Sequence, residues 1–263
     1  MRLSVNISTV YRGIAAPEAI RQARRDGFAG IEIQMPYDTA IEDLREALEE
    51  TGLPLVLINL PFKQGGGEDG VDWPAITAGA EDAFKRGVER ASRYVEAFRI
   101  PAVNALAGIP APAEDRAAVL DRYYANLDYA QSALASLGSA ALVEPVSSND
   151  LPGFLFHTCA DAIAAIDATG GGRRLQFDVY HSHQMEADAF AAFDAHVDRI
   201  GHVQFADWPG RGAPGTGDVD FARWFERLSR PDYTGIGGQG WAGAEYNRDP
   251  DLTDQQDWLG RFF

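Results

Sequence analysis

Short apolar runs alternate with amphipathic stretches along the whole chain, and this alternation limits the possible folds more than any other property of the sequence. Each run is rich in Leu, Ile, Val and Ala and has the length of a single strand. The expected strands cover residues 3–8, 30–35, 55–60, 102–106, 140–144, 175–178, 200–206 and 242–246. Strands that alternate with helices in this way are typical of a parallel sheet covered by helices.

The stretches between the strands have the period of an α-helix. The stretch 79–98, for example, places Val88, Ala91 and Val95 on one face. The expected helices cover residues 17–26, 41–50, 79–98, 115–137, 160–168, 188–196, 220–228 and 253–262. These strand–helix units favour a closed α/β barrel of the (β/α)8 type over an open sheet, because barrels of about 250 residues commonly form one domain. We expect that domain to span residues 1–263.

The composition of the chain limits the molecules that it can bind and the cell compartment in which we expect it. The formal net charge is −16 and the isoelectric point is about 4.6, so the chain lacks the basic surface that nucleic-acid binding requires. The single cysteine, Cys159, excludes an intramolecular disulfide. The N-terminus lacks the pattern of a secretory signal, and no apolar run approaches the roughly 20 residues that span a bilayer. We therefore expect a cytoplasmic protein that binds neither nucleic acid nor membranes.

A polar side chain stands near the carboxyl end of every expected strand. These residues are Asn6, Glu32, Asn59, Asn104, Glu144, Asp178, Gln204 and Glu245. Barrels of this type build their active sites where the strands end and the βα loops begin. The asparagines are equally consistent with hydrogen-bonded layers inside the barrel, and Asn59 is also a candidate substrate contact. The site is expected at this end of the barrel.

Four of these residues come from consecutive strands: Glu144, Asp178, Gln204 and Glu245. Their spacing is about one βα unit each time, so the side chains are expected to converge at the barrel mouth. Three carboxylates at one point repel one another unless a cation neutralises them. An all-oxygen ligand set favours Mg²⁺ or Mn²⁺ over Zn²⁺. Such a cation polarises a carbonyl and stabilises a developing enediolate.

Three further side chains lie beside the expected mouth. His181 follows the sixth strand, where it could hydrogen-bond a substrate or bind a metal. Arg211 lies in the glycine-rich loop after the seventh strand, where it could hold a substrate carboxylate through paired hydrogen bonds. Lys63, just after the third strand, is either a second anion contact or a solvated loop lysine.

Five segments together resemble the hydroxypyruvate isomerase family, which belongs to the xylose-isomerase-like barrel superfamily. They are MPYD, VEPVSSNDLPGF, FDVYH, GHVQFADWPGRGAPGTGDVDF and AEY, and the likeness runs from the first strand to the last. The sequence departs from the family in two places. Ile58 stands where some members have histidine, and the approach to the last strand is longer and richer in glycine. Both departures concern the wall of the expected pocket.

The resemblance implies roles for individual residues. Glu144 and Glu245 match two metal-binding glutamates that also act as acid and base, and Asp178 and Gln204 match the other metal ligands. His181 and Arg211 match substrate-contact positions. Asp150 falls where related ketose epimerases carry a substrate-binding carboxylate. The implied mechanism is proton abstraction next to a metal-polarised carbonyl, followed by reprotonation at the neighbouring carbon.

The leading functional hypothesis is an isomerase that interconverts hydroxypyruvate and 2-hydroxy-3-oxopropanoate (tartronate semialdehyde). A 2-oxo-tetronate isomerase is a close variant. A ketose 3-epimerase is disfavoured because such enzymes usually carry histidine where Gln204 stands. A metal-dependent abasic-site nuclease needs a cluster of histidines and a basic groove, whereas this chain has 5 scattered histidines. A non-catalytic binding barrel is the remaining alternative. The expected partner is a small anionic or sugar-like molecule, and a homo-oligomer is compatible with the sequence.

Overall fold

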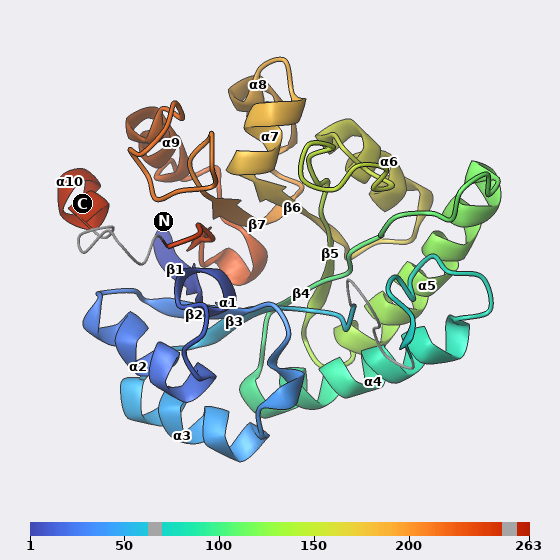
Figure 1. Cartoon of the computed structure of the whole chain (residues 1–263), viewed down its shortest axis with the longest axis horizontal. Coiled ribbons are helices and arrows are strands. Elements are labelled where there is room, and N and C mark those ends of the chain that lie inside the picture. Colours follow the sequence, from blue (N-terminus) through green and yellow to red (C-terminus); the bar gives the residue numbers. More distant parts are fainter. Residues whose placement is uncertain (63–69, 249–256) are drawn as a thin grey trace.

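The computed structural model describes residues 1–62, 70–248 and 257–263, and its strands form one closed barrel. The strands follow one another around the barrel in chain order, and helices surround them (Figure 1). Their bounds are β1 (Arg2–Asn6), β2 (Gly30–Ile33), β3 (Leu55–Asn59), β4 (Ala102–Asn104), β5 (Ala140–Val143), β6 (Arg174–Asp178), β7 (Ile200–Phe205) and β8 (Trp241–Ala244). The predicted (β/α)8 barrel is confirmed.

The barrel closes between its first and last strands. β1 pairs in parallel with β8, with Arg2 opposite Trp241 and Val5 opposite Ala244. Every other neighbouring pair is also parallel, so all strands present their carboxyl ends on the same side of the barrel. The segments that carry the predicted site residues therefore meet on that side.

The helices lie where the amphipathic stretches predict them, with small shifts at their ends. They are α2 (Ala16–Arg25), α3 (Ile41–Thr51), α4 (Glu81–Phe98), α5 (Arg116–Ala135), α6 (Cys159–Ala168), α8 (Ala189–His196), α9 (Phe221–Leu228) and α10 (Asp257–Phe262), with short 3₁₀ turns at η1 (Pro36–Asp38) and η3 (Ile236–Gly238). The first part of the expected helix 253–262 lies outside the described residues. Among the helices described, none combines the length and the apolar character that crossing a lipid bilayer requires.

Two strands turn directly into short helices that the sequence pattern does not predict, α1 (Ile7–Val10) and α7 (Val179–Met185). The last residue of each strand is the N-cap of the helix. The side chain of Asn6 accepts a hydrogen bond from the Ser8 amide at 3.1 Å, and that of Asp178 accepts one from the Tyr180 amide at 2.7 Å. Such caps satisfy amide groups that the first turn leaves unpaired. His181 therefore lies in the first turn of α7 rather than in a loop.

A buried polar layer fills the barrel below its mouth and is centred on Glu32, which is fully buried. The Glu32 carboxylate accepts hydrogen bonds from Ser4 Oγ at 2.6 Å and from Gln204 Nε2 at 2.7 Å, and His202 Nε2 lies 2.7 Å from it. His202 is therefore a buried partner of Glu32 in the barrel interior. Glycine at position 243 makes room for this layer, because a Cβ there would overlap the Glu32 carboxylate.

The Gly243→Ala substitution is expected to lower the free energy of unfolding by about 2–3 kcal/mol, because the added methyl group meets a hydrogen-bonded carboxylate inside a closed barrel. Urea unfolding monitored by circular dichroism measures the effect. Gly171→Ala is the matched control, since open space surrounds its Cβ position, and it should change stability by less than about 0.5 kcal/mol. Equal midpoints for the two variants would contradict the described packing around Glu32.

Candidate active site

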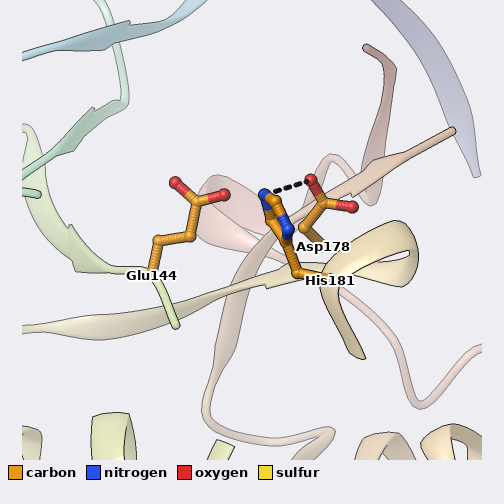
Figure 2. Close-up of side chains that lie close together, drawn as sticks. All are labelled: Glu144, Asp178 and His181. Atoms are coloured by element: carbon orange, nitrogen blue, oxygen red, sulfur yellow. Dashed lines mark ion pairs between the residues drawn. The ribbon is translucent and has the colours of Figure 1, made fainter. Parts of the chain in front are cut away.

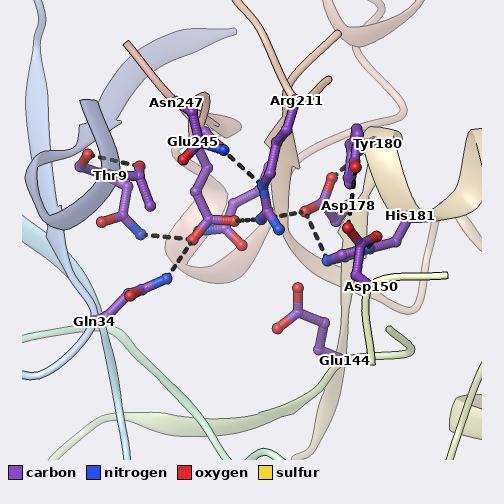
Figure 3. Close-up of polar contacts among 12 residues, drawn as sticks. Thr9, Gln34, Glu144, Asp150, Asp178, Tyr180, His181, Arg211, Glu245 and Asn247 are labelled. Atoms are coloured by element: carbon purple, nitrogen blue, oxygen red, sulfur yellow. Dashed lines mark hydrogen bonds and ion pairs between the residues drawn. The ribbon is translucent and has the colours of Figure 1, made fainter. Parts of the chain in front are cut away.

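A cavity of about 390 Å³ lies at the carboxyl ends of the strands. Of the residues predicted for the site, it is lined by Asn59, Glu144, Asp150, His181, Arg211 and Glu245. Lys63 lies outside the described residues. The structure therefore brings most of the predicted substrate-contact residues and both predicted catalytic glutamates to one cavity, as Figure 3 shows for Glu144, Asp150, His181, Arg211 and Glu245.

Glu144 directly follows β5 and is held by one neighbour. Its Oε2 accepts a hydrogen bond from Asn104 Nδ2 at 2.6 Å, across the junction of β4 and β5. Burial raises the pKa of the Glu144 carboxyl well above its ordinary value, and the negative charges of Glu245 and Asp178 raise it further. The Glu144 carboxyl is therefore easier to protonate than an exposed glutamate.

Asp178 presents one carboxylate oxygen without a hydrogen-bond partner. Its Oδ1 caps α7, whereas Oδ2 is buried and makes no hydrogen bond within the described structure. Two basic side chains lie close to Oδ2: Arg211 Nη2 at 3.5 Å and His181 Nε2 at 3.6 Å. Figure 2 shows Glu144, Asp178 and His181 gathered around one point. One ligand atom from each of these three residues lies within 4.8 Å of the other two.

Glu245 directly follows β8 and has several donors around its carboxylate. Asn6 Nδ2 donates to Oε1 at 2.8 Å. Gln34 Nε2 also donates to Oε1, at 3.1 Å, and Arg211 Nη2 lies 2.5 Å from Oε2 (Figure 3). Burial raises the pKa of the Glu245 carboxyl, and the positive charge of Arg211 opposes this shift without cancelling it. Glu245 is thus drawn toward Arg211 and is not part of the group formed by Glu144, Asp178 and His181.

Arg211 is fixed by a loop that the buried carboxylate of Asp207 organises. Asp207 accepts hydrogen bonds from the amides of Trp208, Gly215, Gly217 and Val219 at 2.8–3.0 Å. Burial alone would lower the pKa of Arg211, but the surrounding carboxylates hold it above its ordinary value. The guanidinium therefore stays charged beside Glu245 and Asp178 and over the Tyr180 ring, 5.0 Å from its centre.

Gln204 points into the buried polar layer around Glu32. Its Nε2 donates to Glu32 as described, and its Oε1, the atom expected to bind a metal, accepts a hydrogen bond from Gln176 Nε2 at 2.5 Å. Gln204 is paired with Asp178 in the sheet, but it is not among the residues that line the cavity. The Gln204 amide is thus engaged by Glu32 and Gln176 in this structure, and its role as a metal ligand stays a prediction.

His181 contacts the backbone on one side and the carboxylates on the other. The Ser147 amide donates to His181 Nδ1 at 3.3 Å. Asp150 lies 3.5 Å from His181 Nδ1 and accepts hydrogen bonds from Tyr180 and Gln184. Burial would raise the pKa of Asp150, but these contacts lower it to about 2. Asp150 is therefore ionised beside the cavity at neutral pH.

The donor set is suited to a divalent cation. Glu144, Glu245 and Asp178 are buried together, and burial and mutual repulsion raise the pKa of both glutamates. Asp178 Oδ2 has no hydrogen-bond partner within the described structure. A buried carboxylate oxygen without a partner is costly, and a cation removes both that cost and the repulsion. The group of three that the structure shows, Glu144, Asp178 and His181, offers two carboxylates and one imidazole to such a cation.

Several residues of the site are not predicted from the sequence. Gln34 and Tyr180 contact Glu245 and Asp150, and Asp207 shapes the loop of Arg211. Asp207 carries a usable signal, because it stands next to the seventh expected strand and before a run of glycines whose amides need an acceptor. Gln34 and Tyr180 carry no signal of their own, since their partners are distant in sequence.

Fold and site together define a (β/α)8 barrel with a carboxylate-rich centre at the carboxyl ends of its strands, the end at which barrel enzymes carry their active sites. The chain belongs to the Xylose isomerase-like TIM barrel family, whose sequence profile matches residues 20–262.

Three relatives illustrate this membership. The chain is 33% identical to the hydroxypyruvate isomerase of Escherichia coli (strain K12), over 94% of this chain and 93% of that protein. It is 31% identical to a 2-oxo-tetronate isomerase of Cupriavidus necator, over 98% of this chain and 97% of that protein. A solved structure named as an AP endonuclease, family 2, from Brucella melitensis superposes with a TM-score of 0.89 at 27% identity, covering 99% of this chain and 98% of that one.

Proposed function

We propose that this protein is an isomerase of small 2-oxo acids that moves a proton between neighbouring carbons, with hydroxypyruvate and 2-hydroxy-3-oxopropanoate as the pair interconverted. The observation that carries the proposal is a pair of buried glutamates, Glu144 and Glu245, in one cavity with Asp178 and Arg211 beside them. Two carboxyls with raised pKa values are suited to accept and return a proton near neutral pH. The relatives named as hydroxypyruvate and 2-oxo-tetronate isomerases support this class of substrate.

The reaction needs only proton transfers. One of the two glutamates takes a proton from C3 of hydroxypyruvate, and the electron pair forms the C2–C3 double bond of an enediolate as the carbonyl oxygen on C2 gains charge. The proton is returned to C2, and the hydroxyl on C3 loses its proton to become the aldehyde oxygen, while the oxygen on C2 becomes a hydroxyl. Atoms and charge balance without an oxidant.

We assign Glu144, Asp178 and Glu245, which are buried together, as the residues that would hold a divalent cation, with Gln204 as the fourth ligand that the family resemblance implies. The structure groups the first two of these with His181. When bound, such a cation withdraws electrons from a carbonyl and stabilises negative charge on its oxygen. His181 is assigned to substrate binding, because its ring lines the cavity and is held in place by the Ser147 amide. Asp150 orients His181 and Tyr180 and, being ionised, can accept a hydrogen bond from a substrate hydroxyl.

The test is an NMR assay in D₂O with purified protein, hydroxypyruvate and, separately, short ketoses, each with and without Mn²⁺. The proposal predicts formation of 2-hydroxy-3-oxopropanoate with solvent deuterium at C2. Deuterium entering only ketoses, at C3, would assign the protein to the epimerases instead. Failure to exchange any hydrogen with Mn²⁺ present would overturn an isomerase function.

A nuclease function is not favoured by the site. In the described chain, the one group of three metal-ligating side chains contains a single histidine, His181. His202 is bound to Glu32 in the barrel interior, and His157 contacts the Val146 carbonyl. The formal net charge of −16 opposes binding to a polyanion.

A further inference from the structure

Arg12 is a cationic residue of the cavity that no argument above has used. It follows α1 at the mouth of the barrel, lines the same cavity as the glutamates, and is exposed to solvent. Its guanidinium contacts an amide oxygen rather than a carboxylate, since Nη2 donates to Asn247 Oδ1 at 3.3 Å. Among the described residues, Arg12 makes no ion pair, so its charge is available to a ligand.

The other arginine of the cavity, Arg211, already forms ion pairs with protein carboxylates. Arg211 lies 2.5 Å from Glu245 and 3.5 Å from Asp178, so its positive charge is shared between two buried carboxylates. Asp150, whose pKa is lowered to about 2, adds further negative charge to the cavity wall. An acid that enters such a cavity is repelled unless a cation meets its carboxylate. Among the described residues that line the cavity, Arg12 is the arginine whose charge is free to bind that carboxylate.

The backbone around Arg12 is anchored to the site. Asn6 begins the helix that precedes Arg12, and the same side chain donates to Glu245 at 2.8 Å. Next to Arg12, the buried Tyr11 donates its hydroxyl to Asp26 at 2.6 Å. On the opposite side, the amide of Asn247 donates to the Arg211 carbonyl at 2.8 Å. Hydrogen bonds thus connect both sides of Arg12 to the site. Its own segment is connected to Glu245 through Asn6, and Asn247, which its guanidinium contacts, is connected to Arg211.

We infer that Arg12 binds the carboxylate of the substrate at the mouth of the cavity and thereby makes the site select acids over neutral hydroxyketones; this inference rests on the proposed function. The planar guanidinium offers two parallel N–H groups to a carboxylate, and Asn247 holds it by one of its remaining donors. Arg211 stays with Glu245 and Asp178, so the two arginines have separate tasks.

The test compares Arg12→Gln, Arg12→Lys and the wild type in steady-state turnover of hydroxypyruvate with Mn²⁺. Loss of a charge-assisted hydrogen bond to the carboxylate should raise KM roughly ten- to a hundredfold, with kcat changed less than about threefold. Arg12→Lys should recover part of the loss, because it keeps the charge but not the paired donors. Arg24→Gln, an exposed arginine on α2, is the matched control and should behave as the wild type.

Binding without turnover separates this inference from the proposed function. Calorimetric titration of the Mn²⁺-loaded protein with glycerate and with glycerol should show that Arg12→Gln weakens glycerate roughly ten- to a hundredfold and leaves glycerol unchanged. If the protein is inactive in the D₂O assay but Arg12→Gln still weakens glycerate binding alone, the proposed reaction is refuted and the anion-binding role of Arg12 stands. The inference is overturned if glycerate binds the wild type and Arg12→Gln with equal affinity, or if it does not bind the wild type. So does a Lys63→Gln variant that carries the KM effect in place of Arg12→Gln.

Discussion

Replacing Glu144 by glutamine should lower the turnover of the proposed isomerisation by on the order of 10³ or more, because an amide cannot accept the proton that the reaction moves. The substitution keeps the shape of the side chain, and its Oε1 can still accept the hydrogen bond from Asn104. Glu245→Gln should have an effect of the same order. Deuterium exchange in D₂O, followed by NMR, measures both variants.

Glu49→Gln is the control for Glu144→Gln, because Glu49 is an exposed glutamate on α3, away from the cavity. It should retain the activity of the wild type. Unfolding midpoints of the three variants must be compared first, so that loss of activity is not loss of fold. Turnover retained by either Glu144→Gln or Glu245→Gln would remove that glutamate from the mechanism.

Saturating Mn²⁺ or Mg²⁺ should raise the melting temperature of the metal-free protein, because a cation relieves the repulsion among Glu144, Asp178 and Glu245. Binding at a hundred times the dissociation constant adds about 2.7 kcal/mol of stability. For a chain of this size, that gain corresponds to roughly 5–10 °C. Differential scanning calorimetry after treatment with a chelator, with and without added cation, measures the shift independently of activity.

Asp178→Asn should abolish most of this shift while keeping α7, because the asparagine Oδ1 can still accept the hydrogen bond from the Tyr180 amide. Asp188→Asn provides the same chemical change at the N-cap of α8, outside the cavity, and should keep the full shift. An unchanged melting temperature with either cation, or an equal shift in Asp178→Asn and the wild type, would exclude the proposed metal centre.

The barrel and the location of its site follow from the sequence because both depend on local patterns. Apolar runs of strand length that alternate with amphipathic helices admit few architectures, and parallel strands bring all their carboxyl ends to one side. The depth at which a side chain lies within the barrel does not follow from such local patterns. Glu144 and Glu245 come directly after their strands and reach the cavity, whereas Glu32 and Gln204 stand one residue before the ends of β2 and β7 and lie in the interior layer.

The partners of the charged groups could not be predicted for a related reason. The sequence places Arg211 near the mouth, but its engagement with Glu245 and Asp178 depends on the loop that Asp207 organises. The sequence leaves His181 open between substrate binding and metal binding, and the Ser147 amide that contacts its ring is 34 residues away in sequence. Such contacts are decided by the folded arrangement of several loops and not by residue type or spacing.

The Asn6 side chain has two structural functions, capping a helix and holding a carboxylate of the site. Its oxygen starts α1 and its nitrogen holds the carboxylate of Glu245. Aspartate at this position would preserve the helix start but would set a negative charge against Glu245, and serine would preserve the start but lack the nitrogen. We therefore expect few substitutions of Asn6 to preserve both functions, because each of these helix-capping alternatives removes or opposes the hydrogen bond that holds the Glu245 carboxylate.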